Sequence, residues 1–136
     1  MPLRIGFIVV LLVAGHRVAL ADEPITWTLH LGPESTADGA VAAAVEDLSA
    51  AAESVGLRVV AADAPPAPPF RAIVVGDRAR NPDAGRVLEG AGFEGEPEPD
   101  PQAFSIRTRT LKDGTILWVA GGSVLGDAYG LLWLRE

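Results

Sequence analysis

The chain has 136 residues, with 18 acidic and 11 basic side chains and a formal net charge of −7. This length allows a single domain, and an acidic surface repels phosphate backbones and anionic membranes, so nucleic acid and lipid surfaces are disfavoured as partners. The chain contains no cysteine, which excludes disulfides, zinc–thiolate sites and thiol nucleophiles.

Residues 1–21 have the pattern of an export signal. Arg4 supplies the positive start, residues 5–14 form an apolar run, and residues 19–21 (Ala-Leu-Ala) fit the small-x-small cleavage pattern. The run has about ten residues, whereas a membrane span needs roughly 20. We therefore expect a signal peptide over 1–21, with an uncleaved anchor or a buried strand as alternatives. The mature domain, 22–136, is then a secreted or periplasmic protein with no membrane attachment after cleavage.

The mature chain begins with a predicted strand, helix and strand. Ile25–Leu31 alternates apolar and polar residues, as a half-buried strand does. Ser35 and Asp38 then resemble a capping box, and Gly56 suits the end of the helix that follows. The apolar stripe of this helix recurs at spacings of four and three residues and comprises Val41, Val45, Leu48, Ala52 and Val55. Leu57–Ala61 predicts a short second strand.

A proline-rich segment separates this unit from the rest of the predicted sheet. Asp63–Pro69 is expected to be irregular because proline supplies no donor to a strand ladder. Phe70–Gly76 is apolar on both faces, which is typical of a central parallel strand. Residues 81–83 (Asn-Pro-Asp) predict the start of a short helix that continues through Leu88.

The remaining sequence predicts a hairpin and a closing helix. Ala103–Thr110 and Thr115–Ala120 are strands joined by a turn that contains Asp113-Gly114, a strong hairpin signal. The last 21 residues, Ile116–Glu136, contain the second of these strands, a glycine turn and a helix. The predicted order is β-α-β-β-α-β-β-α, an α/β fold with sandwich-like layers in which about three helices cover a mixed β-sheet.

The closing helix is apolar around most of its circumference. Leu125, Tyr129, Leu132 and Trp133 form one stripe, while Leu131 and Leu134 point elsewhere. A helix of this kind is normally buried on more than one side, and one side is accounted for by the domain's own sheet. The pattern therefore predicts a partner, or self-association, on the other side.

Few residues suggest catalysis. Ser123 follows a strand and opens a helix like a nucleophile elbow, and a triad would need His30, the one histidine after residue 21, with Asp77 or Asp127. Helix capping is the simpler role for Ser123.

Three other patterns give no strong prediction of a ligand. Residues 90–95 match G-x-G-x-x-G, but a helix precedes them and an acidic, proline-rich loop follows, which is the wrong context for a dinucleotide. Arg107 and Arg109 share a strand face that is either solvated or able to hold a carboxylate. One histidine and scattered acids offer no metal cluster, so no metal or cofactor is expected.

The closing sequence resembles the end of an N-terminal domain found in alpha-glucuronidases and bacterial-type beta-hexosaminidases. The matching residues are the strand Ile116–Gly121, the phrase Gly126-Asp127-Ala128-Tyr129-Gly130 and the helix Leu131–Glu136. The helix Val41–Gly56, the strand Ala72–Gly76 with its following Asn81-Pro82, and Gln102–Arg107 also agree with that family.

The resemblance implies a non-catalytic α/β accessory domain that precedes a (β/α)8 barrel, which carries the catalytic acids. No catalytic residue is therefore assigned to this chain. Tyr129, Trp133 and Leu134 match a helix that packs on the barrel, in cis or in trans, and are the candidate interface residues. The chain is expected to be a fragment or a standalone copy of this domain from an exported, carbohydrate-degrading glycoside hydrolase; the alternative is a small exported serine hydrolase that uses Ser123.

Overall fold

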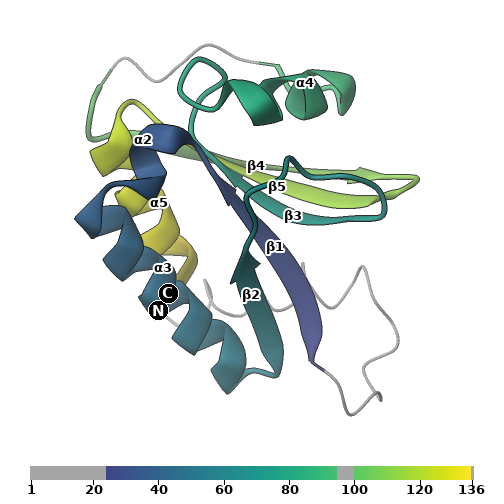
Figure 1. Ribbon diagram of the computed structural model, residues 1–136, viewed down its shortest axis with the longest axis horizontal. Helices are drawn as coiled ribbons and strands as arrows, with labels where there is room; N and C mark the ends of the chain where they lie inside the picture. The colour runs from purple at the N-terminus through teal and green to yellow at the C-terminus, as the bar shows by residue number, and fades with distance from the viewer. Residues whose placement is uncertain (1–23, 95–99, 136) are drawn as a thin grey trace.

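A computed structural model describes residues 24–94 and 100–135 of the chain (Figure 1). The predicted signal peptide, residues 1–21, lies outside the described residues. The helices and strands, in chain order, are β1 (Ile25–Leu31), α2 (Pro33–Thr36), α3 (Gly39–Ser54), β2 (Leu57–Ala61), β3 (Phe70–Val75), α4 (Pro82–Gly90), β4 (Phe104–Leu111), β5 (Gly114–Gly121) and α5 (Val124–Arg135).

The strands form one mixed sheet in the order β2-β1-β3-β5-β4. Strands β2, β1, β3 and β5 run parallel to one another. Strand β4, at the edge of the sheet, pairs antiparallel with β5. The central strands β3 and β5 are buried on both faces over most of their length, as their continuous apolar sequences require. The predicted α/β fold with a mixed sheet is confirmed. The one-turn helix α2 is additional, because a segment this short carries no periodic signal.

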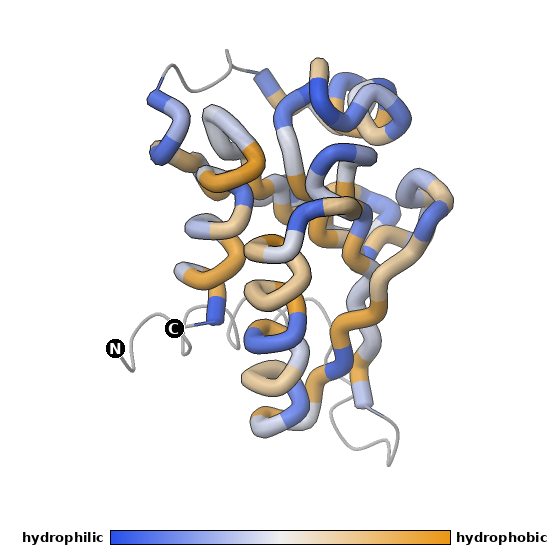
Figure 2. Tube along the Cα trace, turned by 60° about the vertical axis from the view of Figure 1, so that its left-hand side comes forward, coloured by the Kyte–Doolittle hydropathy of each residue, from blue (hydrophilic) through white to orange (hydrophobic). Residues whose placement is uncertain are grey.

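Helices cover the two faces of the sheet unequally (Figure 1). The helices α3 and α5 lie side by side on one face, and their core is built from Trp27, Leu29, Val41, Ala44, Leu48, Ala52, Leu57, Ile73, Val75, Leu117, Val119, Ala128, Leu131 and Leu134. The short helix α4 covers the other face mainly over β3 and β5, and its core is built from Val74, Ala84, Leu88, Ala91, Phe93, Ile116, Trp118 and Ala120. In Figure 2 most of α5 is coloured hydrophobic, whereas α4 is mostly hydrophilic.

The start of the long helix differs from the predicted capping box. Asp38 is the N-cap of α3, and its carboxylate accepts a hydrogen bond from the backbone N–H of Val41 at 3.0 Å. Ser35 lies instead in α2, where it is buried and donates to Asp127. The capping-box prediction was wrong because α2 takes up Ser35 in a turn of its own. The predicted helix end is confirmed, since Gly56 has a φ of +82°.

Candidate functional site

A buried ion-pair network joins the carboxyl ends of β3 and β5 to the helices α2 and α5. Asp127, in the first turn of α5, is fully buried and accepts both terminal nitrogens of Arg80, with Nη2 at 2.9 Å from Oδ1. It also accepts the Ser35 hydroxyl at 2.9 Å and the Gly121 backbone N–H at 2.8 Å. Asp77 binds the other side of the guanidinium, because its Oδ2 accepts Arg80 Nε at 3.2 Å.

The charged groups of this network pair with one another and stabilise the fold. Hydrogen bonding to Asp127 raises the pKa of Arg80 above its usual value, against the opposing effect of burial, and Asp77 adds to the increase. Asp77 and Asp127, the two acids considered as members of a triad, therefore share one permanently charged arginine. Because Asp127 is sealed from solvent and both carboxylates are hydrogen-bonded, the pair offers no accessible general acid or base.

The structure does not assemble a catalytic triad around Ser123. Its Oγ donates to the carbonyl of Pro101 at 2.6 Å and accepts the backbone N–H of Gly126 at 3.4 Å, which is the geometry of a helix cap. His30 lies at the end of β1, which β3 separates from β5 in the sheet, and its Nδ1 is 3.1 Å from Asn81. The hydroxyl proton of Ser123 thus points to a carbonyl and not to a base.

Three arginines on the α4 side of the sheet bind backbone carbonyls of the segment that follows α4. Arg109 Nη2 donates to Gly92 O at 2.7 Å, while Arg78 and Arg107 donate to the carbonyls of Phe93 and Glu94, respectively. The guanidinium groups of Arg78 and Arg107 also lie 5.2 and 5.6 Å from the centre of the Trp118 ring.

Arg107 and Arg109 thus hold the loop that follows α4 by binding its carbonyl groups. A carboxylate ligand would have to displace these contacts. The same loop contains the G-x-G-x-x-G match. Its first glycine is the last residue of α4 and Gly95 lies outside the described residues, so a helix precedes the motif, as the sequence indicated. Neither pattern forms a ligand site in the described part of the chain.

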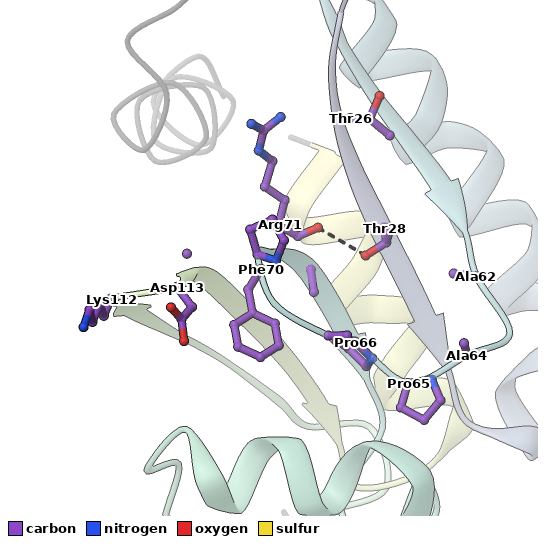
Figure 3. Close-up of a pocket in the computed structure, with 14 residues that line it drawn as sticks. Thr26, Thr28, Ala62, Ala64, Pro65, Pro66, Phe70, Arg71, Lys112 and Asp113 are labelled. Atoms are coloured by element: carbon purple, nitrogen blue, oxygen red, sulfur yellow. Dashed lines mark hydrogen bonds between the residues drawn. The ribbon is translucent and has the colours of Figure 1, made fainter.

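A shallow groove of about 770 Å³ lies over the first residues of β1 and β3 (Figure 3). Its floor contains Thr26 and Thr28, and Thr28 Oγ1 donates to the carbonyl of Arg71 at 3.2 Å. The walls are the proline-rich crossover segment, residues 62–69, and the hairpin turn at Lys112 and Asp113. Phe70 places its ring between these walls (Figure 3).

A second, smaller pocket of about 260 Å³ lies at the carboxyl ends of β1 and β2. Its lining includes His30, Thr36, Asp63 and Asp83. The sequence placed His30 on the polar face of a half-buried strand, yet its side chain is only 4% exposed and is bonded to Asn81. Among the described residues, no three His, Cys, Asp or Glu side chains come together as a group that could hold a metal ion.

The candidate interface residues on α5 separate into two classes. Tyr129 is 40% exposed, as is Leu125 one turn before it, and Trp133 is half-buried at the edge of the core. Leu134 is only 3% exposed and belongs to the domain's own core between α3, α5 and the sheet. Leu134 is therefore withdrawn as an interface residue, because its surface is already used inside this domain. Tyr129 lies on the outer side of α5, and Trp133 lies at the margin of the core, against which it packs.

The glycines of the closing phrase explain how α5 lies so close to the sheet. A Cβ at Gly126 would be 2.4 Å from the carbonyl oxygen of Ala103, and one at Gly130 would be 2.5 Å from Val119 Cγ1. Asp127 anchors the network and Ala128 is in the core, so the fold itself uses four of the five residues from 126 to 130. Tyr129 is the exception.

No helix in the described part of the chain is long and apolar enough to cross a membrane. Comparison with protein-family models and with curated proteins gave no match.

Proposed function

We propose that this chain is a non-catalytic accessory domain of an exported glycoside hydrolase, of the type that precedes the (β/α)8 barrel in alpha-glucuronidases and bacterial-type beta-hexosaminidases. Its role is to pack against the catalytic barrel, in cis or in trans. The outer side of α5, with Leu125, Tyr129 and Trp133, is the docking surface. The sugar chemistry then belongs to the barrel and not to this domain.

The exposure of Tyr129 is the observation that best supports a docking surface on α5. Within the phrase 126–130, the other four residues pack against the sheet or bind the ion-pair network, and each has a physical reason inside the domain. Tyr129 has 40% of its surface exposed and is not among the residues that build the core between α3, α5 and the sheet. Tyrosine and tryptophan are enriched at protein interfaces because they combine a large apolar area with a polar group, which supports a docking role.

The arrangement around Ser123 lends no support to the alternative of a serine hydrolase. The hydroxyl caps α5, and the histidine that would activate it is held by Asn81 at the end of another strand. Activity by that route would need a base within hydrogen-bond reach of the hydroxyl.

The proposal can be tested by measuring what the outer side of α5 binds when no barrel is present. We expect the purified chain to bind a hydrophobic dye and to self-associate in sedimentation experiments. Tyr129→Ser should reduce both effects. Val60→Ser, which removes an apolar side chain of similar exposure (43%) from β2, serves as the matched control and should leave both unchanged. A monodisperse chain with no dye binding would contradict the proposal.

A further inference from the structure

The polar face of β1 lies beside α4 and not beneath it. Thr26, Thr28 and His30 alternate along this face, and the hydrophobic cluster beneath α4 contains no residue of β1. The chain returns from β2 to β3 through the crossover segment, residues 62–69, which contains no helix. This leaves room for the pocket at His30, where the carboxyl ends of two parallel strands meet. Such edges are the usual position of ligand sites in α/β sheets.

The hydrogen bonds of Asn81 determine which nitrogen of His30 carries the proton. Asn81 Nδ2 donates to the carbonyl of Val75 at 2.9 Å, and Asn81 Oδ1 accepts the backbone N–H of Ala84 at 3.4 Å, so the orientation of the amide is fixed. Nδ2 also lies 3.1 Å from His30 Nδ1. An amide nitrogen can only donate, so Nδ1 is the acceptor and the neutral ring is protonated at Nε2.

The Nε2–H group of His30 is a donor that the protein does not use. It has no hydrogen-bond partner among the described residues. It is also not one of the side-chain nitrogen or oxygen atoms of these residues that are both fully buried and unpaired. His30 as a whole residue is 96% buried, and it lines the pocket. Because His30 lines the pocket and its Nε2–H has no partner in the described protein, an oxygen of a ligand in the pocket would be the acceptor for this hydrogen bond.

The other polar groups of the pocket are acceptors. Asp63 and Asp83 line the pocket from the crossover segment after β2 and from the first turn of α4. The Thr36 hydroxyl donates to Gly32 O at 2.9 Å, which leaves its lone pairs to accept. The pocket combines one fixed donor with several acceptors. A ligand with several hydroxyl groups matches this set, because each hydroxyl can donate to a carboxylate or accept from an imidazole.

We propose that this pocket binds one ring of a polyhydroxylated ligand, a neutral monosaccharide unit. One ligand hydroxyl accepts the hydrogen bond from His30 Nε2–H, and others donate to Asp63 and Asp83. The volume of about 260 Å³ lies below the roughly 300–1,000 Å³ of most ligand sites, which suits a single ring. Two carboxylates in the wall repel an anionic sugar.

This site is independent of the proposed docking role. The pocket lies at the carboxyl ends of β1 and β2, and its lining contains no residue of α5. Either proposal can fail while the other holds, because the docking surface contains none of the pocket residues.

The test is a titration of the purified protein with D-glucose, followed by the imidazole ¹⁵N and ¹³C NMR signals of His30. Before sugar is added, the signals should show the Nε2–H tautomer. Glucose should then shift them in a saturable manner, and D-glucuronate should bind more weakly. Asp83→Asn should weaken glucose binding by about tenfold, since it removes a charged acceptor. Asp83 is exposed at the start of α4, so this variant leaves the core intact.

Glu89→Gln removes the same charge near the other end of α4, outside the pocket, and is the matched control. Its glucose affinity should equal that of the wild-type protein. The Nδ1–H tautomer, the absence of a saturable shift, or equal binding by Asp83→Asn and the wild type would each overturn the proposal.

Discussion

Replacing Asp127 by asparagine should be among the most destabilising single-atom changes in this domain. Asp127 is fully buried and accepts hydrogen bonds from Ser35, Gly121 and both terminal nitrogens of Arg80. Asparagine has nearly the same shape, but it removes the negative charge. Its N–H₂ group is a donor, and it would face the N–H and O–H donors that the carboxylate now accepts. Arg80 has a side chain only 15% exposed and would keep Asp77 as its one remaining carboxylate.

The expected cost follows from the burial of the pair. Removing one partner of a buried ion pair costs about 3–5 kcal/mol, because the remaining charge is left without compensation. A domain of this size has a total stability of about 5–15 kcal/mol, so Asp127→Asn removes a large share of it. For a urea m value of about 1.5 kcal/mol/M, the unfolding midpoint should fall by roughly 2–3 M.

The assay is urea unfolding of the wild-type and variant proteins, with Asp47→Asn as the control. Asp47 pairs with Arg135 at 3.6 Å, but the two side chains are 52% and 41% exposed, and such surface pairs contribute about 0–1 kcal/mol. The double variant Asp127→Asn/Arg80→Met should lose less than the sum of the single losses, since the two residues interact directly. A loss for Asp127→Asn no larger than that of Asp47→Asn would refute the reasoning.

Two further predictions concern the same region. Gly130→Ala should cost about 1–3 kcal/mol in urea unfolding, because the added Cβ would lie 2.5 Å from Val119 Cγ1, whereas Gly90→Ala meets nothing within 4 Å and should be neutral or stabilising. Arg80→Lys should make stability sensitive to alkaline pH. The raised pKa of Arg80 keeps its contribution intact throughout the accessible alkaline range, whereas a lysine's contribution is complete only below about pH 10.4 and is lost as pH rises through its folded pKa. Urea midpoints at about pH 8 and pH 11 should therefore diverge between the two proteins, and parallel changes would count against this explanation.

The strands could be predicted because their signals are local. Alternation identifies β1, the apolar run identifies β3, and Asp113-Gly114 identifies the hairpin of β4 and β5. All three agree with the structure. The helix caps at Asn81 and Gly56 are equally local, since each depends on a neighbour within a few residues.

The contacts that organise the candidate sites could not be predicted, because they join residues far apart in the sequence. Ser35 and Asp127 are separated by 92 positions, and His30 and Asn81 by 51. Asn81 was predicted as a helix cap, and that role alone explains its residue type, so nothing in the sequence pointed to its bond with His30.

The closing helix shows the same limit. Its apolar stripes could be listed from the sequence, but only packing shows that Leu131 and Leu134 face the sheet while Tyr129 faces outward. The periodicity already set Leu134 apart from the stripe of Tyr129 and Trp133, but it could not show which of the two sides is buried in this domain.

The most direct test of the proposed function is the affinity of this chain for a (β/α)8 catalytic domain of an alpha-glucuronidase or bacterial-type beta-hexosaminidase prepared without its own N-terminal domain. Isothermal titration calorimetry should detect binding, and Tyr129→Ser should weaken it at least tenfold, as expected for an interface tyrosine. Val60→Ser should bind like the wild type. No binding to the barrel, or equal affinity for the wild-type chain and Tyr129→Ser, would contradict the assignment of α5 as the docking surface.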